Sequence, residues 1–292
     1  MTMDLRFSVI VPVWNSPDLI AKCLTALEDQ SFPRDRYEVI VVDNGSTDQT
    51  AEVIARFPGV TMLSERKPGS YAARNRGLAE ARGEFVAFTD ADCIPHRDWL
   101  TAADEAIGLE PGKAIYGGRM TLFASDEDSP VCRAYEEIFS FDQRKYLATG
   151  HCVTANWVSP LSLIRDLGGF DAKLKSGGDF DMSGRISRRG LPIVYVPEMQ
   201  VAHPYRGSPI EIVNKKRRTI GGSWTMRTTA KARLKLAAWV VFAFGQDVRR
   251  VWQGSEIGSG LKLRLSLLLT QACAAQLGEI GRLALGGEAR RS

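Results

Sequence analysis

Two carboxylates, Asp90 and Asp92, follow a short apolar segment in the stretch E-F-V-A-F-T-D-A-D-C of residues 84–93. Residues 85–88 have the length and composition of a buried strand. Because residues two apart in an extended chain point to the same side, we expect both carboxylates to face one polar target. A hard divalent cation is the simplest such target, since it takes oxygen ligands from carboxylates and from substrate phosphates. The alternative is a solvated turn that carries two acids.

Three further side chains have surroundings that suggest chemistry. Asp179 and Asp181 stand in S-G-G-D-F-D, where glycines permit close approach of a ligand before a helix that is expected to reach Arg189. The alternative role for both is to cap that helix and compensate its dipole. His203, just past a strand expected at 193–196, could join two carboxylates around Mn²⁺ or Mg²⁺, or be structural.

These residues need a scaffold, and the hydrophobic pattern predicts one. Strands are expected at residues 7–13, 37–42, 60–63 and 85–88, separated by helices at 17–27, 46–57 and 71–82, of which the second opens with a capping box from Ser46 to Gln49. Such alternation predicts an α/β fold with a doubly wound, mostly parallel sheet flanked by helices. Ligands of these sheets bind beyond the carboxyl ends of the strands, where Asp90 and Asp92 stand. No dinucleotide-binding or P-loop motif is present.

Later in the chain the pattern is less regular. Helices are expected at 98–107, 130–141 and 160–167, and a strand is expected at 114–122.

Composition and charge divide the chain. Its 292 residues are 44% hydrophobic and 25% charged, which is ordinary for a globular protein. Five scattered cysteines without a C-x-x-C pair argue against disulfides and a zinc cluster and for a reducing cytosol, and no signal peptide is expected. Residues 207–292 hold 15 Lys and Arg against 5 Asp and Glu, whereas residues 1–206 hold 23 against 29. We expect a catalytic domain at 1–206 and a basic helical region at 207–292.

The basic region predicts a contact with negative charge. Lys215–Arg218 could hold a diphosphate or a phosphorylated acceptor, or form a solvated basic face. The apolar run Leu236–Phe244 is shorter than the roughly 20 residues of a membrane span, and charges interrupt Leu261–Leu285. We expect helices that lie on an anionic membrane surface, with Trp239 and Trp252 as anchors. The alternative is a helical cap or dimer interface; the oligomeric state stays open and no nucleic-acid partner is expected.

Taken in order, the motifs resemble those of family 2 glycosyltransferases of the GT-A fold. The resemblance extends from Phe7 to about His203. The motifs are V-I-V-P-V-W-N at 9–15, V-V-D-N-G-S-T-D at 41–48, A-A-R-N-R-G at 72–77, F-T-D-A-D at 88–92, G-G-F-D at 168–171 and G-G-D-F-D at 177–181. Each motif alone is weak, and their joint order and spacing carry the resemblance.

The resemblance implies a nucleotide-diphosphate sugar donor, a divalent cation and a catalytic base. The residues it assigns to the nucleotide sugar are Pro12, Val13, Trp14, Asn15, Asp43, Arg74, Asp90 and Ala91. It implies Asp92 as the direct ligand of Mn²⁺ or Mg²⁺, with Asp90 and His203 beside it, and Asp179 as the base. Trp157, Gly178 and Asp181 are assigned to the acceptor side. A UDP-sugar is favoured through the resemblance alone, and guanosine and thymidine donors remain open.

The implied reaction is a metal-dependent, inverting transfer to a lipid-linked or polysaccharide acceptor at the cytoplasmic face of the membrane. The Q-x-x-R-W signature of processive synthases is absent, which favours addition of a single sugar. Two residues depart from the family pattern: Gly178 stands where Glu is usual, and Asn44 where Asp is frequent. Two alternatives remain. One is a sugar nucleotidyltransferase, although the loop W-N-S-P-D lacks its glycines and basic residue; the other is a non-catalytic sugar-nucleotide-binding protein.

Overall fold

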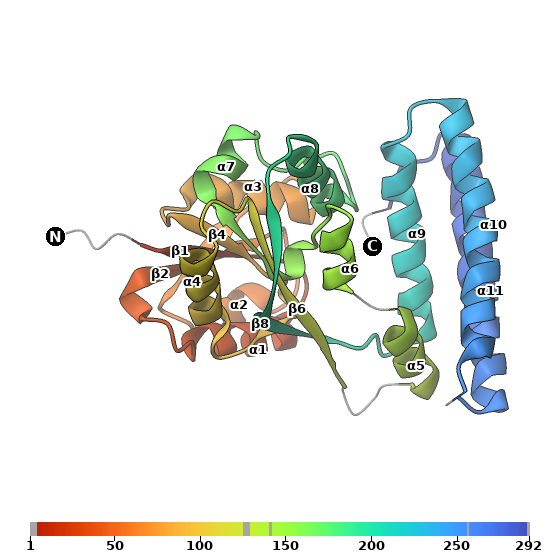
Figure 1. Ribbon diagram of the computed structural model, residues 1–292, viewed down its shortest axis with the longest axis horizontal. Helices are drawn as coiled ribbons and strands as arrows, with labels where there is room; N and C mark the ends of the chain where they lie inside the picture. The colour runs from red at the N-terminus through yellow and green to blue at the C-terminus, as the bar shows by residue number, and fades with distance from the viewer. Residues whose placement is uncertain (1–4, 125–128, 140–141, 256, 291–292) are drawn as a thin grey trace. The chain divides into compact units, whose positions relative to one another are not determined.

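The computed structural model describes residues 5–124, 129–139, 142–255 and 257–290 and divides the chain into two compact units (Figure 1). The first unit comprises Met1–Phe123, Phe141–Lys173 and Gly178–Pro204. The second comprises Ala124–Ser140, Leu174–Gly177 and Tyr205–Ser292.

Among the described residues, the first unit contains one eight-stranded sheet in the order β3-β2-β1-β4-β7-β6-β8-β5. The strands are β1 (Phe7–Val13), β2 (Tyr37–Asp43), β3 (Val60–Ser64), β4 (Phe85–Phe88), β5 (Ile94–Pro95), β6 (Ile115–Phe123), β7 (Trp157–Pro160) and β8 (Ile193–Pro204). The pairings β1–β2, β1–β4, β2–β3 and β6–β8 are parallel. The pairings β4–β7, β6–β7 and β5–β8 are antiparallel. The predicted α/β sheet is therefore present.

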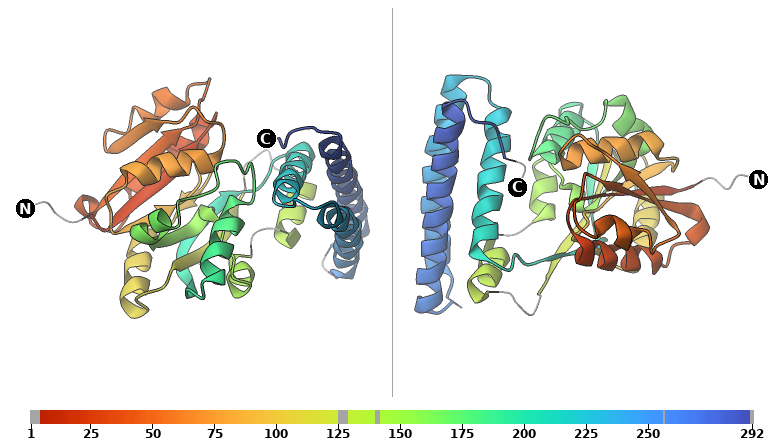
Figure 2. Two further views of the ribbon diagram at one scale, coloured as in Figure 1. Left: turned by 90° about the horizontal axis from the view of Figure 1, so that it is seen from above. Right: turned by 180° about the vertical axis from the view of Figure 1, so that it is seen from behind.

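Helices cover both faces of this sheet (Figures 1 and 2). The helices of the first unit are α1 (Pro17–Glu28), α2 (Thr50–Ile54), α3 (Ser70–Glu80), α4 (Trp99–Leu109), α6 (Gln143–Ala148), α7 (Leu161–Asp166) and α8 (Gly178–Arg188), with 3-10 turns at Arg34–Arg36 and Thr154–Asn156. Strand alternation sorts the core, because Val9 and Val11 join the cluster that contains Ile20 of α1 and Trp99 of α4. Ile10 faces the other way and packs against Gly77 of α3.

In the parallel half of the sheet, the carboxyl ends of β1, β2 and β4 lie side by side, and each is followed by a loop. Val13 of β1 pairs with Asp43 of β2, and Ile10 of β1 pairs with Phe88 of β4. The segments that follow these strands therefore leave the sheet at the same edge, which is where the sequence predicted a ligand site.

Three elements were not expected from the sequence: β5, β7 and α6. Two expected elements differ from the observed ones by more than two residues at an end. Strand β8 continues to Pro204, so His203 lies inside a strand rather than just past one. The capping box at Ser46–Gln49 was wrong: α2 begins at Thr50, and Asp48 Oδ1 accepts from its backbone N at 3.0 Å. The last two residues of the helix expected at 130–141 lie outside the described residues.

The second unit is helical. It contains α5 (Pro130–Phe139), α9 (Pro209–Thr225), α10 (Ala230–Gln253) and α11 (Ser259–Ala284). Apolar side chains of α11, such as Leu265 and Leu269, pack with Tyr135 of α5 and Ile212 of α9. Two acids are almost fully buried here, and each is paired: Glu136 with Arg206, and Glu279 with Arg282 and Arg290. Within the described chain, no helix combines the length and apolarity that a membrane crossing requires.

Candidate active site

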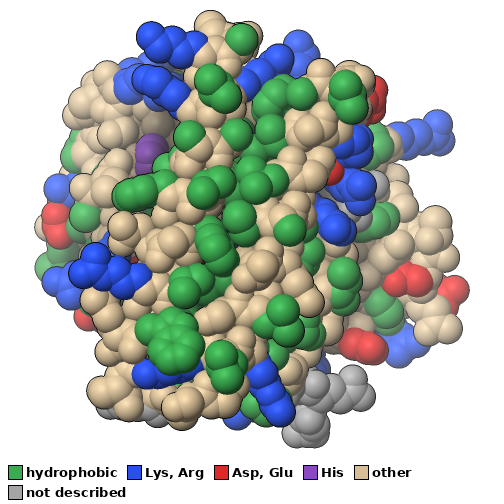
Figure 3. Space-filling view, turned by 90° about the vertical axis from the view of Figure 1, so that its right-hand side faces the viewer, with side chains coloured by type: hydrophobic (Ala, Val, Ile, Leu, Met, Phe, Trp, Pro, Cys, Tyr) green, Lys and Arg blue, Asp and Glu red, His purple; other side chains and the backbone are tan. Residues whose placement is uncertain are grey.

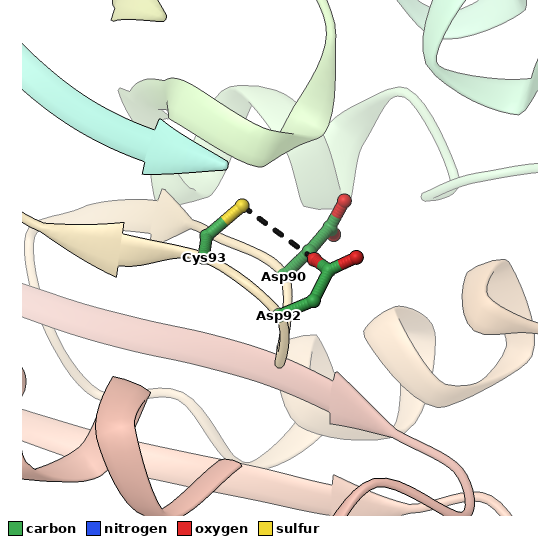
Figure 4. Close-up of side chains that lie close together, drawn as sticks. All are labelled: Asp90, Asp92 and Cys93. Carbon is green, nitrogen blue, oxygen red and sulfur yellow. Dashed lines mark hydrogen bonds between the residues drawn. The ribbon is translucent and has the colours of Figure 1, made fainter. Parts of the chain in front are cut away.

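Asp90 and Asp92 converge through a tight turn that follows β4. The backbone N of Cys93 donates to the carbonyl of Asp90 at 3.0 Å, and residues 91 and 92 form the turn. The expectation of extended geometry at this position was therefore wrong, although the carboxylates still lie together. The ligand atoms of Asp90, Asp92 and Cys93 are all within 4.8 Å of one another (Figure 4). Ala91, between the two acids, is buried.

His203 meets this pair from β8. Its Nε2 lies 3.4 Å from Oδ2 of Asp92, and its side chain is 7% exposed. Its Nδ1 lies 2.7 Å from the carbonyl oxygen of Pro204, which can only accept a hydrogen bond. Nδ1 therefore donates this hydrogen bond, and Nε2 is the ring nitrogen that faces Asp92, the arrangement found in metal-ligating histidines.

The donor set fits a hard divalent cation. Two carboxylates and an imidazole nitrogen suit Mn²⁺ or Mg²⁺, which keep further positions for water or phosphate oxygens. The sulfur of Cys93 is a poor ligand for such an ion. Burial, with Asp92 and Asp90 nearby, raises the pKa of this thiol, which donates a hydrogen bond to Asp92 Oδ1 at 3.6 Å (Figure 4).

Arg74 of α3 is a buried cation beside the carboxylates. Its guanidinium Nη2 forms an ion pair with Asp90 Oδ1, and its side chain is 3% exposed. Its Nε is buried and receives no hydrogen-bond partner from the described residues. Because buried donors are normally satisfied, this group suits a ligand with acceptor oxygens, such as a phosphorylated one.

Asp179 lies in the first turn of α8. Its Oδ1 accepts from the hydroxyl of Tyr71 at 3.2 Å and from the backbone N of Phe180 at 3.0 Å. Burial raises the pKa of Asp179, while the Phe180 N–H and the charge of Arg74 oppose the rise. The carboxylate is thus more basic than an ordinary aspartate, a property that suits proton abstraction.

The loops after β1 and β2 are joined to each other. Asn15 Oδ1 accepts from the backbone N of Thr47 at 2.8 Å, and Ser46 Oγ accepts from the backbone N of Asn15 at 2.9 Å. Asp43 Oδ1 accepts from the backbone N of Ser46 at 3.0 Å. Of the predicted pocket residues here, Pro12 and Val13 are buried in β1, whereas Trp14 is 39% exposed and can meet a ligand.

Asn44, where the family often has Asp, uses its amide as a donor. Its Nδ2 donates to the carbonyls of Glu65 at 2.9 Å and Lys67 at 2.8 Å, and its Oδ1 accepts from Gly69 N at 2.7 Å. A carboxylate could not donate to the two carbonyls. The amide therefore fixes the loop that leads into α3, the helix of Arg74.

The three residues assigned to the acceptor side lie in different surroundings. Gly178 immediately precedes Asp179, with its backbone against the ring of Tyr71. Asp181 accepts from Arg185 Nε at 3.0 Å within α8, a contact that a stabilising role explains. Trp157 is fully buried, and its Nε1 donates to Ser159 Oγ at 2.5 Å. Its position in the core does not support a direct contact with an acceptor.

Sequence reasoning missed two residues beside Asp179. Tyr71 was treated only as the start of a helix, although its spacing of three residues puts it on the same helix face as Arg74. His151 precedes β7 and packs against Phe180, with ring centroids 4.9 Å apart. Burial lowers the pKa of His151, and the charge of Asp179 partly offsets this effect. Its loop carries no recognisable motif, so no sequence signal marked it.

Comparisons with known proteins agree with these motifs. The chain matches the family Glycosyl transferase family 2 over residues 8–166. It is 30% identical to the glycosyltransferase AglE of Haloferax volcanii over an alignment of 303 positions. The alignment covers 97% of this chain and 97% of AglE. Its fold is similar to that of the mannosyltransferase PcManGT from Pyrobaculum calidifontis in complex with GDP-Man and Mn²⁺, with a TM-score of 0.66 and 21% identity over 94% of this chain and 88% of that one. S. aureus TarS 1-349 in complex with UDP gives a TM-score of 0.57 and 18% identity over 98% and 93% of the respective chains.

Proposed function

The chain belongs to glycosyl transferase family 2 and has the GT-A fold that its motifs predicted, and from this premise we propose that it is an inverting, single-sugar transferase. Its donor is a nucleotide-diphosphate sugar, with a UDP-sugar favoured, and its acceptor is a hydroxyl of a lipid-linked or polysaccharide molecule. Family membership favours sugar transfer over the nucleotidyltransferase alternative.

One observation carries the proposal: a continuous set of contacts joins the Asp90–Asp92 turn to Asp179. Asp90 pairs with Arg74, the Arg74 guanidinium carbon lies 5.6 Å from the centroid of the Tyr71 ring, and Tyr71 donates to Asp179. Carboxylates suited to hold a donor's cation, and a guanidinium suited to its diphosphate, thus share one site with a carboxylate suited to be a base. This combination is what a displacement at the anomeric carbon requires.

In the proposed reaction, Asp179 accepts the proton of the acceptor hydroxyl. The acceptor oxygen forms a bond to the anomeric carbon as the bond between that carbon and the diphosphate oxygen breaks, and the nucleoside diphosphate leaves with the electron pair. A single displacement of this kind inverts the anomeric configuration. Base catalysis of this type contributes roughly 10²- to 10⁴-fold to the rate.

Asp92, Asp90 and His203 would hold Mn²⁺ or Mg²⁺, which neutralises the developing charge of the diphosphate when it is bound. Arg74 adds a fixed positive charge beside Asp90 and a buried Nε donor. The exposed face of Trp14 and the loop from Asp43 to Ser46 are proposed to contact the nucleoside. Pro12, Val13, Asn15 and Ala91 shape the same pocket.

A donor panel tests the proposal. Release of nucleoside diphosphate is measured from UDP-glucose, UDP-GlcNAc and GDP-mannose with Mn²⁺ or Mg²⁺, for the wild type and for Asp179→Asn. We expect one donor to be turned over, with at least a roughly 100-fold loss in the variant and an inverted product by NMR. Binding of a donor without turnover of any would instead support the non-catalytic alternative.

The proposed membrane contact is supported by the outer faces of α10 and α11. Large apolar side chains are exposed along both helices: Leu234, Trp239, Val241, Phe242 and Trp252 on α10, and Leu263, Leu267 and Leu277 on α11. Every exposed charge among the described residues of these helices is positive: Lys231, Lys235, Arg249, Arg250 and Arg264. Apolar side chains bordered by Lys and Arg are visible on this face in Figure 3. This combination suits an anionic bilayer surface at the cytoplasmic side.

Vesicle co-sedimentation tests the membrane contact. We expect binding to vesicles that contain phosphatidylglycerol, weaker binding to pure phosphatidylcholine, and weaker binding at high salt. Trp239→Ala with Phe242→Ala should weaken it, whereas Leu109→Ala, an exposed leucine of α4, should not. A dimer that these two substitutions dissociate, without any lipid binding, would favour the dimer-interface alternative.

A further inference from the structure

The side chain of Tyr71 is tightly packed next to the carboxylate of Asp179. Its ring is 6% exposed and stacks on Phe170, with centroids 5.7 Å apart and an interplanar angle of 26°. Phe170 in turn packs edge-on against Phe88 and Trp157. Burial raises the pKa of the Tyr71 phenol, so its hydroxyl remains a hydrogen-bond donor at neutral pH.

The two oxygens of Asp179 are not equivalent. Oδ1 accepts both from Tyr71 and from the backbone N of Phe180. Within the described part of the chain, Oδ2 receives no hydrogen bond, so it is the oxygen available to an acceptor hydroxyl. Two donors on one oxygen fix the rotation of the carboxylate about its last torsion.

Gly178 allows this arrangement. A Cβ at residue 178 would lie 2.8 Å from Cδ2 and Cε2 of Tyr71, closer than real Cβ atoms approach other atoms. The backbone before Asp179 therefore rests on the tyrosine ring. The Tyr71 ring fixes the position of the backbone that carries Asp179, and the Tyr71 hydroxyl fixes the orientation of the Asp179 carboxylate.

Building on the proposed function, we propose that Tyr71 is the positioning residue for the base: it fixes Oδ1 of Asp179 so that Oδ2 is presented to the acceptor hydroxyl. It acts from α3, the helix that also carries Arg74, the ion-pair partner of Asp90. Donor side and base are therefore set by one rigid element. The acceptor proton moves to Oδ2, and Tyr71 keeps its own proton throughout.

Tyr71→Phe removes only the hydroxyl and tests this role. Tyr146→Phe is the matched control, because Tyr146 also lies near Asp179, with its ring 5.3 Å from that of Phe180, yet it donates no hydrogen bond to Asp179. The charged and titratable groups that face Asp179 are Tyr71 and Arg74 of α3, Asp90 after β4, Tyr146 of α6, and His151 and Cys152 before β7.

We expect Tyr71→Phe to lower the plateau kcat about tenfold, the effect of one hydrogen bond to a charged group. Donor KM should be unchanged, and the acidic limb of the kcat profile should move to higher pH, since the lost bond stabilised the ionised form. Tyr146→Phe should match the wild type in plateau kcat, in donor KM and in the position of the acidic limb. A second readout needs no turnover: Tyr71→Phe should lose more thermal stability at about pH 8 than at about pH 4.5, whereas in an Asp179→Asn background this difference should vanish.

The outcomes separate the two proposals. If Asp179→Asn releases nucleotide at the wild-type rate, the base assignment is wrong and the role of Tyr71 falls with it. If Asp179→Asn is inactive but Tyr71→Phe equals the wild type in plateau rate and pH profile, the proposed function stands and the positioning role is wrong. An equal loss in Tyr146→Phe would also overturn the positioning role.

Discussion

Nε2 of His203 lies 3.4 Å from Oδ2 of Asp92, which brings the end of β8 to the turn after β4. The contact links residues that are far apart in sequence. We predict that His203→Ala weakens Mn²⁺ binding about 10- to 100-fold and that Asp92→Asn weakens it at least as much. Calorimetric titration of the protein with Mn²⁺ measures both effects without any substrate.

His96→Ala is the control for this prediction, because His96 is exposed, its Nδ1 lies 3.7 Å from Oδ2 of Asp98 just before α4, and it does not belong to the cluster of Asp90, Asp92 and Cys93. The Mn²⁺ affinity of the His96→Ala variant should equal that of the wild type. Wild-type affinity in His203→Ala would show that the imidazole is structural, the alternative raised by the sequence.

The raised pKa of Asp179 predicts opposite effects on activity and stability. The group must be ionised to act as a base, so activity should fall as pH drops through a pKa that lies above the ordinary 3.8. The folded state binds this proton more tightly than the unfolded state, so the ionised carboxylate lowers the free energy of unfolding at neutral pH. Asp179→Asn should therefore lose roughly 10²- to 10⁴-fold in transfer rate and gain melting temperature at neutral pH, with the gain shrinking as the pH approaches the ordinary pKa of an aspartate.

Thermal scans of wild type and Asp179→Asn at several pH values measure this gain. Asp181→Asn is the control: it removes an ion pair with Arg185, so it should lower the melting temperature slightly rather than raise it. A melting temperature of Asp179→Asn below that of the wild type at neutral pH would contradict the prediction, because the ionised carboxylate would then stabilise the fold.

The parallel half of the sheet could be predicted from sequence because its strands are short, largely apolar segments that alternate with helices. The antiparallel pairings could not, since each involves β5 or β7. β5 has only two residues, and β7 reads W-V-S-P, so it lacks the all-apolar composition that identified β4 at the same length; both are defined by partners distant in the chain. Tertiary context, rather than local pattern, forms them.

The site shows the same division. Asp90, Asp92, Asp179 and Arg74 lie in motifs and could be assigned to the candidate site from the sequence, whereas the contacts that join them could not be predicted. The carboxylates converge through a turn, not through strand alternation, and Tyr71 carries no motif of its own. Its role depends on the missing side chain at Gly178, 107 residues later in the chain. Such pairwise fits are invisible in single-sequence reasoning.

Asn44→Asp should destabilise the protein although it restores a residue frequent in the family. It replaces a donor with a carboxylate that faces the carbonyls of Glu65 and Lys67, in a position that is 4% exposed. We expect a loss of about 2 to 3 kcal/mol in the free energy of unfolding, measured by urea denaturation at neutral pH.

Asn44→Ala separates lost hydrogen bonds from buried charge in this experiment. It removes the same donor without adding a carboxylate, so it should cost less than Asn44→Asp at neutral pH. The difference should narrow at low pH, where the new acid is protonated and can donate. Equal stability of Asn44→Asp and the wild type would mean that the loop before α3 does not depend on the amide.

Gly178→Ala should impair the reaction without unfolding the protein. The added methyl group would lie 2.8 Å from the Tyr71 ring, which Phe170 holds in place, so the start of α8 rather than the ring must shift. A shift of the base by a fraction of an ångström misaligns it, and we expect kcat to fall roughly 10- to 100-fold with little change in donor KM.

Gly108→Ala is the control, because a methyl group there meets no atom within 4 Å and residue 108 lies in α4. Tyr71→Ala opens the space that the methyl group needs, so Gly178→Ala should cost much less in that background than in the wild type. Additive losses in the double variant would mean that Gly178 and Tyr71 act independently.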